Sequence, residues 1–305
     1  MTSDFLSDVE RRLDEAAADP RQWTSALEAI VRATGSDGAA LLTIEGRGPV
    51  VLPTESMIAL ADDYIQNGWY KKDFRYRGVP LLKKNDIFVD QDIVSMDQMQ
   101  RMPYYQDFLI KHGFGWFAGI KVDTGDDIWC LTLQRRFKAG GYDHDEQRKL
   151  VRLGGGVSRA AKIARQLGYA RLDGAAAAFE HSPDPCFFLD RFGAVIRFND
   201  AAGRLIGQDL QLREGQLRLL SPKDQALQNL IQACLLQSPI EQSDSIQPVA
   251  VTRVGKRPLV FHAMSLSGSL QAAFSPARAL LAAIDLEAKI LESVPKLMTL
   301  GRCAG

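Results

Sequence analysis

The sequence predicts an α+β protein of two domains, each built around an antiparallel sheet, with a long helix joining them. The chain has 305 residues, which exceeds the roughly 100–200 residues of a single domain. Short β-type runs bounded by turn residues occur in two groups, within residues 38–134 and within residues 186–286. Between the groups, a helical pattern continues from residue 143 to about residue 179, much longer than the average helix of about 11–12 residues.

The first group of elements begins with two amphipathic helical patterns in residues 4–33, which Pro20 separates. Helices are also expected from about residue 54 to residue 67 and over residues 103–112, where Pro103 suits a first turn. The strands expected here cover residues 38–44, 49–52, 114–122 and 128–134. Residues 69–100 are expected to be irregular, and an unstructured segment longer than about 12–15 residues is usually functional or disordered. Its aromatic residues favour function.

The long helix is expected to begin at Asp143, because Glu146 follows at the spacing of a capping box. Its apolar residues alternate spacings of three and four and are Leu150, Leu153, Val157, Ala160, Ala164 and Leu167. Such a narrow seam favours a partner helix from a second copy of the chain. The alternative is that the helix lies on its own domain. Glycines 154–156 predict either a kink or a close approach to another backbone.

The second group of elements consists of two strands, helices and three further strands. The expected strands cover residues 186–190, 194–198, 248–254, 258–266 and 279–286. Asn199 is placed to cap a helix that follows the second strand, because its side chain can accept hydrogen bonds from free backbone N–H groups. Asp190 can do the same within the preceding turn, where Gly193 can take a positive φ.

Residues 179–207 resemble the entry sequence of a Per-Arnt-Sim (PAS) sensor domain, with Asp190, Gly193 and Asn199 at the expected positions. The upstream domain is similar, more loosely, to the GAF or autoinducer-binding class. The whole chain resembles the sensory region of LuxR-type bacterial transcription regulators. This resemblance implies signal sensing linked to transcription regulation, by binding a small molecule or a partner. The domains expected are a GAF-like domain with N-terminal helices (1–142), a connecting signalling helix (143–180), a PAS domain (181–288) and a C-terminal tail (289–305).

Regulators of this type carry a helix-turn-helix after the last PAS strand, whereas the segment 288–305 is too short for such a module. Direct DNA binding is therefore not expected. The chain is either a shortened member of the family or acts through another regulatory protein. A homodimer formed through the long helix and the N-terminal helices is expected as well.

The segment containing Trp69, Tyr70 and Asp73 resembles the region where acyl-homoserine-lactone receptors place a tryptophan, a tyrosine and an aspartate around the ligand head group. The resemblance implies these three residues as ligand-binding residues. In such a pocket Asp73 can accept an amide N–H while Trp69 covers an apolar face. The alternative is that Asp73 pairs with Arg75 or Arg77 at the surface and Trp69 is a core residue.

Two further tryptophans, Trp116 and Trp129, lie on adjacent expected strands. They are candidates to face the same ligand cavity. The alternative is that both are ordinary core residues.

The composition excludes several classes of function. The chain has 37 basic and 37 acidic residues, so no net positive field attracts a polyanion. No apolar run reaches the roughly 18–20 residues that span a bilayer. The N-terminal segment is acidic and amphipathic, unlike a secretory signal. The expectation is a cytoplasmic protein without a membrane segment.

Cofactor and enzyme motifs are absent from the sequence. The cysteines show no CxxC spacing and the four histidines are scattered, so no metal site is expected. A flavin photosensor needs a reactive Asn-Cys-Arg run, and a haem sensor needs an axial ligand; residues 221–237 contain no histidine. No phosphate loop, HExxH or GxSxG motif occurs. We therefore expect no cofactor and no enzyme activity, and the alternative to a sensor is an interaction scaffold without a ligand.

Overall fold

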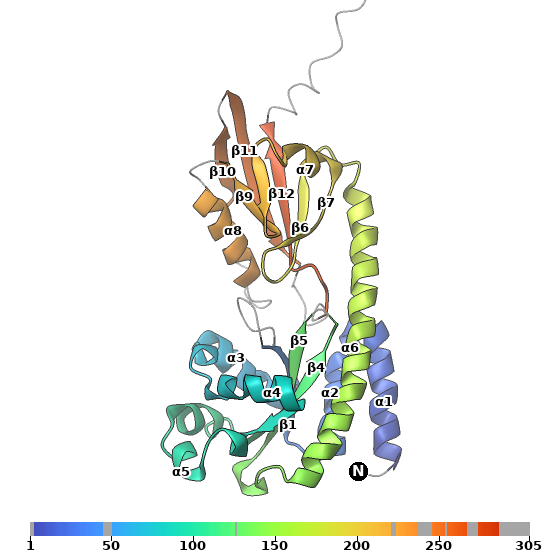
Figure 1. Cartoon of the computed structure of the whole chain (residues 1–305), viewed down its shortest axis with the longest axis vertical. Helices are drawn as coiled ribbons and strands as arrows, with labels where there is room; N and C mark the ends of the chain where they lie inside the picture. The colour runs from blue at the N-terminus through green and yellow to red at the C-terminus, as the bar shows by residue number, and fades with distance from the viewer. Residues whose placement is uncertain are drawn as a thin grey trace, which may run out of the picture. The chain divides into compact units, whose positions relative to one another are not determined.

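The computed structural model describes residues 3–44, 51–125, 127–220, 224–236, 246–253, 255–266 and 274–286. The chain divides into two compact units. The first unit comprises residues 1–169 together with 269–275, and the second comprises residues 170–268 together with 276–305. Both combine helices with antiparallel sheets, which confirms the predicted α+β class (Figure 1). The predicted C-terminal tail, 289–305, lies outside the described residues.

The first unit is built on a five-stranded antiparallel sheet with the order β2-β1-β5-β4-β3. Its strands are β1 (Gly38–Thr43), β2 (Val51–Pro53), β3 (Ile87–Val89), β4 (Trp116–Asp123) and β5 (Ile128–Arg135). Strand β3 pairs with β4 at the sheet edge, although its residues fall in the segment predicted to be irregular. That prediction is wrong at this point, because three apolar residues between Asp86 and Asp90 are too few to show a period of two.

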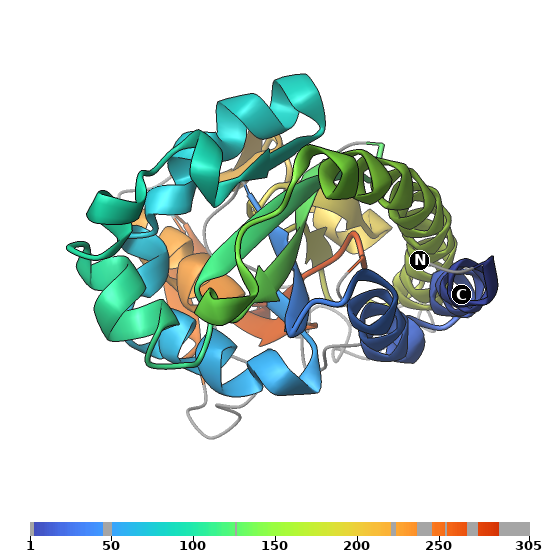
Figure 2. The ribbon, with the colours of Figure 1, turned by 90° about the horizontal axis from the view of Figure 1, so that it is seen from below.

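One face of this sheet is covered by three helices, α1 (Ser3–Ala18), α2 (Trp23–Thr34) and the first part of α6 (His144–Phe179). Figure 2 shows them side by side. Apolar residues of α1 and α2 pack on the odd-numbered residues of β1 and β5, including Leu41, Leu131 and Leu133. This is the larger core of the first unit.

The apolar seam of α6 packs within this core and not on a second copy of the chain. Its buried members are Leu150, Leu153, Val157, Ala160, Ala161 and Ala164. The prediction of a seam between two chains is therefore wrong for these residues. A sheet face whose side chains are apolar has to be covered, and α6 supplies that cover from the same chain.

The glycines of α6 explain how closely the helix approaches the sheet. The helix is continuous from His144 to Phe179, and of the two alternatives for the glycines the structure shows the close approach. A Cβ atom added to Gly154 would lie 2.5 Å from Ile120 Cγ2 and 3.3 Å from the carbonyl oxygen of Lys121. At Gly155 nothing lies within 4 Å of the added atom. Gly154 therefore permits close packing of α6 on β4.

The start of α6 is confirmed in detail. The backbone N–H of Glu146 donates to Asp143 Oδ1 at 2.8 Å, and the N–H of Asp143 donates to Glu146 Oε2 at 3.0 Å. These reciprocal bonds form the capping box that the sequence predicts. Glu146 also pairs with Arg135 on β5 at 2.7 Å, which fixes the helix start to the sheet.

The opposite sheet face is covered by short helices, mostly from the segment between β2 and β4. They are η2 (Glu55–Met57), α3 (Ile58–Gln66), η3 (Trp69–Lys71), η4 (Phe74–Gly78), α4 (Val79–Asn85), η5 (Asp90–Asp92), α5 (Met96–Met99) and the π-helix η6 (Tyr104–Leu109). A helix over residues 103–112 was expected, and η6 occupies most of it. Even-numbered residues of β5, such as Cys130 and Thr132, point toward this layer.

The second unit has a five-stranded antiparallel sheet with the order β10-β11-β12-β6-β7. Its strands are β6 (Cys186–Leu189), β7 (Val195–Phe198), β10 (Val249–Arg253), β11 (Lys256–Ser265) and β12 (Ala279–Asp285). Helices α7 (Asp200–Leu205) and α8 (Asp224–Leu236) lie between the first two strands and the last three, as predicted. A small hairpin, β8 (Leu210–Arg213) and β9 (Gln216–Leu219), lies between these helices and was not predicted.

The polar residues at the entry of the second unit have the structural roles predicted for them. Asn199 Oδ1 accepts the N–H of Ala202 and of Cys186, each at 3.0 Å. Asp190 Oδ1 accepts the N–H of Phe192 and of Ala194, each at 2.8 Å, and Gly193 has a φ of 81°. These side chains hold a helix start and a turn.

Candidate functional site

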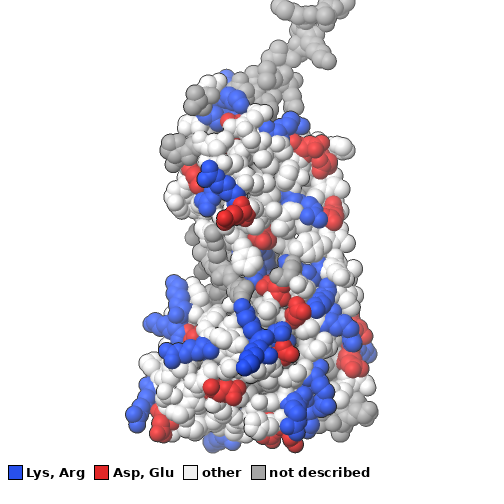
Figure 3. All heavy atoms as spheres, in the orientation of Figure 1, with Lys and Arg blue, Asp and Glu red and all other residues white. Residues whose placement is uncertain are grey.

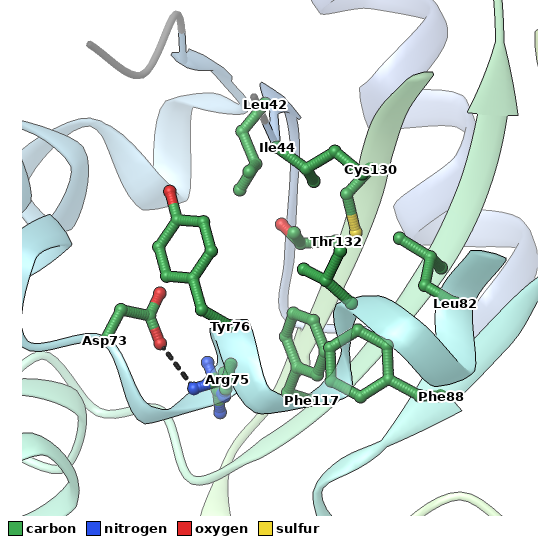
Figure 4. Close-up of a pocket in the computed structure, with 11 residues that line it drawn as sticks. Leu42, Ile44, Asp73, Arg75, Tyr76, Leu82, Phe88, Phe117, Cys130 and Thr132 are labelled. Atoms are coloured by element: carbon green, nitrogen blue, oxygen red, sulfur yellow. Dashed lines mark hydrogen bonds between the residues drawn. The ribbon is translucent and has the colours of Figure 1, made fainter. Parts of the chain in front are cut away.

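A small pocket lies in the first unit, between the sheet and the layer formed by η4 and α4 (Figure 4). Its volume is about 30 Å³. The lining residues are Leu42, Ile44, Asp73, Arg75, Tyr76, Val79, Leu82, Phe88, Phe117, Cys130 and Thr132. Most are apolar or aromatic, with a few polar groups, which is the usual composition of a small-molecule site.

Asp73 is the carboxylate of this pocket. It caps η4, since its Oδ1 accepts the N–H of Arg75 at 2.8 Å, and its Oδ2 accepts the hydroxyl of Tyr64 at 2.8 Å. Burial raises the pKa of Asp73, and the charge of Arg75, these two hydrogen bonds and a further one with the Tyr104 side chain offset only part of that effect. A ligand that donates a hydrogen bond to Asp73 would stabilise the ionised carboxylate.

Arg75 turns its side chain away from Asp73 and into the interior. Its Nε and Nη2 donate to the two oxygens of Asp90 at 2.9 and 2.8 Å, and Nη1 donates to Gln134 Oε1 at 3.3 Å. Arg75 is 5% exposed and Asp90 is fully buried. The Tyr105 hydroxyl donates to Asp90 at 2.8 Å. This buried cluster ties η4, η5 and η6 to strand β5.

The alternative interpretation, a surface pair of Asp73 with Arg75 or Arg77, is not what the structure shows. Arg75 bonds Asp73 only through its backbone N–H, and the Arg77 guanidinium lies 4.4 Å from the Phe74 ring centre. The guanidinium of Arg75 therefore binds Asp90 in a bidentate manner and not Asp73. The hydrogen bonds of Asp73 come from the Arg75 backbone N–H and from the side chains of Tyr64 and Tyr104.

Trp69 and Tyr70 lie beside Asp73 in the chain but do not line the pocket. Both are half-buried and pack on an aromatic cluster that includes Tyr64 and Phe108. The Trp69 ring stacks on Phe108 with 5.2 Å between ring centres. Their predicted ligand contact stays a prediction, and only Asp73 of these three residues lies at the pocket.

The indole of Trp69 is held by a second carboxylate. Its Nε1 donates to Asp63 Oδ1 at 3.1 Å, and His112 Nε2 lies 2.7 Å from Asp63 Oδ2. The hydrogen bond from His112 is the main cause that lowers the pKa of Asp63. This arrangement fixes η3 to α3 and η6.

Trp116 and Trp129 do not share a cavity, so that prediction is wrong. Trp116 belongs to the aromatic cluster of the short helices, and its Nε1 donates to the carbonyl of Phe137 at 2.9 Å. Trp129 belongs to the core under α1 and α2, where its ring lies 4.8 Å from that of Phe274. In the register of the two strands, Trp116 pairs with Arg135 and Trp129 with Val122, at opposite ends of the hairpin.

The sheet residues of the pocket and the Arg75–Asp90 pair were missed in the sequence. One signal was present: Asp90 directly follows the apolar run Ile87–Val89. A charged residue that borders a buried strand needs a partner of opposite charge. The sequence does not show which of the neighbouring basic residues supplies it.

Within the described residues, no group of three or more His, Cys, Asp or Glu side chains is arranged to hold a metal ion. No helix in that part of the chain combines the length and apolar character needed to cross a bilayer.

Cys130, in the pocket wall, is buried, and burial raises the pKa of its thiol to about 12. It is therefore a neutral thiol at physiological pH. Figure 3 shows basic and acidic side chains interspersed on the visible surface of each unit.

No protein-family model matches the chain, and no curated protein matches it. Among solved structures, the chain is similar to the VqsR ligand-binding domain from Pseudomonas aeruginosa, at 20% identity and a TM-score of 0.43. That match covers 52% of this chain and 95% of the other.

Two further structures match most of the chain at lower similarity. The bacteriophytochrome RpBphP3 from R. palustris is 12% identical with a TM-score of 0.35, and the match covers 92% of this chain and 64% of the phytochrome. The E. coli DhaR(N)–DhaL complex is 13% identical with a TM-score of 0.29, covering 93% and 90%. Likeness at this level assigns no residue and no ligand.

Proposed function

We propose that this chain is a signal-sensing regulatory protein whose first unit binds a small molecule in the pocket beside Asp73. The observation that carries the proposal is the pocket itself. It combines apolar walls with one carboxylate, Asp73, whose pKa burial raises. Perturbed carboxyl groups in apolar pockets are typical of functional sites.

The second unit supports the regulatory part of the proposal. Its entry sequence resembles a PAS sensor domain, and apart from the β8–β9 hairpin its order of two strands, helices and three strands is the order expected from that resemblance. A ligand can shift such a protein between two states only by its differential affinity for them. The output that we propose, in line with the LuxR-type resemblance, is regulation of transcription through a homodimer or another regulatory protein.

An interaction scaffold without a ligand is the second candidate. The observation that favours it is the small volume of the pocket, which holds about two water molecules, since each needs roughly 10–15 Å³. In that case the aromatic residues around the pocket serve as core, and the protein acts through its surfaces.

A native mass spectrum of the full-length protein, followed by a denaturing spectrum of the same sample, separates the two candidates. A sensor is expected to carry an extra mass that disappears on denaturation. The Asp73→Ala variant should lose that mass, and Asp145→Ala, whose carboxylate is exposed on α6, should keep it. Absence of any extra mass after expression in several growth media would favour the scaffold.

A further inference from the structure

The pocket of the first unit encloses little space, so a metabolite buried in it requires one of the lining side chains to move. Its volume of about 30 Å³ corresponds to about two water molecules. Ligand sites usually enclose most of the ligand surface. Which side chain moves therefore decides what the pocket can bind.

The sheet side of the pocket is fixed by packing. Phe117, Cys130 and Thr132 are all at most 4% exposed and lie on paired strands. The Phe88 ring lies directly against two glycines, since an added Cβ would be 2.1 Å away from it at Gly78 and 2.8 Å away at Gly119. These side chains are closely packed, so a change of rotamer would require neighbouring atoms to move.

The helical side holds two further residues in place through hydrogen bonds. Asp73 is fixed by the N–H of Arg75 and by Tyr64, and the Arg75 side chain is fixed by Asp90. Leu82, from α4, is completely buried. Displacing any of these would break a buried polar cluster or open a cavity in the core.

Tyr76 differs from all the other lining residues. Of the eleven residues that line the pocket, it is the most exposed, at 36%. Its side chain is hydrogen-bonded to that of Tyr64, so this one bond is broken when the ring leaves the pocket. Its ring stands between Asp73 and the side chains of Leu42 and Ile44 (Figure 4). It lies on the 3₁₀ turn η4, and a rotation about its χ1 would carry the ring from the pocket toward solvent.

From this geometry we infer that Tyr76 determines the ligand size: its ring closes the pocket, and a ligand binds by replacing the ring. This inference rests on the proposed function. Six ring carbons, a hydroxyl oxygen and two waters make room for a ligand of roughly nine heavy atoms. The ligand class is therefore a compact single-ring molecule with an N–H or O–H donor for Asp73 and an apolar edge toward Phe88 and Phe117. A long acyl chain does not fit.

The test uses p-cresol, which has the shape of the tyrosine side chain. It is titrated by calorimetry into the full chain as wild type, Tyr76→Phe and Tyr76→Ala. The alanine variant is expected to bind at least about tenfold more tightly than the wild type, because the phenol ring gains a buried apolar surface without first displacing Tyr76. Tyr76→Phe keeps the ring in place and should behave like the wild type.

Equal affinity in all three proteins would overturn the inference. So would an alanine variant that does not bind although its tryptophan fluorescence and its melting temperature show an intact first unit. Adding Asp73→Ala to Tyr76→Ala should weaken p-cresol binding, which places the probe in this pocket and not on the surface.

The native mass spectra distinguish failure of this inference from failure of the proposed function. If Tyr76→Ala binds p-cresol but the wild type never carries a ligand, the proposed function fails and the closure by Tyr76 stands. If the wild type carries a ligand with a long chain or several rings, the sensor function stands and the inference about Tyr76 is wrong.

Discussion

Asp90 is fully buried, and its two oxygens bind the guanidinium of Arg75 and the hydroxyl of Tyr105. Three helical segments and strand β5 meet at these side chains. A buried ion pair adds little compared with well-packed apolar residues, but removing one partner leaves an uncompensated charge. The stability of the helical layer around the pocket therefore depends on Asp90 more than on any exposed ion pair.

We expect Asp90→Asn to destabilise the first unit by about 3–5 kcal/mol, because the Arg75 charge stays buried without its counter-charge. All four tryptophans lie in the first unit, so urea unfolding followed by tryptophan fluorescence reports on this unit. The matched control is Asp145→Asn, whose ion pair with Arg148 is about 70% exposed on both sides; its effect should stay within about 1 kcal/mol. Equal effects of the two variants would contradict the role assigned to Asp90.

Asp73 makes stability depend on pH in a predictable direction. Burial raises its pKa above the ordinary value of 3.8. Between that value and the raised one, the folded state binds more protons than the unfolded state, so stability falls as pH rises. Asp73→Asn keeps the cap of η4, since asparagine is an equally good N-cap, and removes the titration.

The stability of Asp73→Asn relative to the wild type should therefore increase as pH rises from 4 through the raised pKa, and then stay constant. Thermal unfolding of both proteins between pH 4 and pH 8, followed by tryptophan fluorescence, measures this difference. Other titrating groups are common to both proteins and cancel. A difference that is flat over the whole range would show that Asp73 is not desolvated.

At the level of elements, α6 shows how two neighbouring glycines differ. Gly154 faces β4 with no room for a Cβ, whereas nothing lies near Gly155. Gly154→Ala is expected to destabilise the first unit by about 1–3 kcal/mol through overpacking. Gly155→Ala should stabilise it by up to about 1 kcal/mol, because alanine has the higher helix propensity.

Urea unfolding of the two variants in parallel measures both effects, and each serves as the control for the other. A stabilising Gly154→Ala would mean that α6 does not pack closely on β4. A destabilising Gly155→Ala would contradict the open space that the structure shows around position 155.

The regular elements could be predicted because their signals are local. The capping box of Asp143 and Glu146 and the cap at Asn199 depend on residues a few positions apart. Strand β3 and the β8–β9 hairpin are too short for a clear period of two. Helix starts are therefore the elements that the sequence predicts best, because the side chain and the backbone groups that it caps lie within one turn of each other.

The pocket depends on contacts that the sequence alone does not reveal. Asp73 could be named in advance, whereas Cys130 and Thr132 reach the same pocket from a strand more than fifty positions away. Trp129 was misplaced for a related reason: on a strand, neighbouring residues face opposite sides, and Cys130 therefore occupies the pocket side. The alternation of side chains along a strand shows which residues share a face of the sheet. Which of the two faces carries the pocket is seen only in the folded structure.

At the level of the whole molecule, the predicted homodimer needs a surface other than the α6 seam. The seam residues from Leu150 to Ala164 are buried in the first unit. Ile163 and Leu167 remain 40% and 38% exposed, and they lie four positions apart on one side of α6. We propose that any homodimer formed through α6 uses these two residues.

The double variant Ile163→Glu and Leu167→Glu is expected to be a monomer in sedimentation velocity at concentrations where the wild type is a dimer. Two carboxylates in an apolar interface would lose solvation without gaining a partner. The matched control is Ile58→Glu with Ile65→Glu, which changes exposed apolar residues of α3 and should leave the dimer intact. A monomeric wild type would remove the homodimer from the proposed function, whereas a dimer that survives in the α6 variant would mean that another surface joins the two copies.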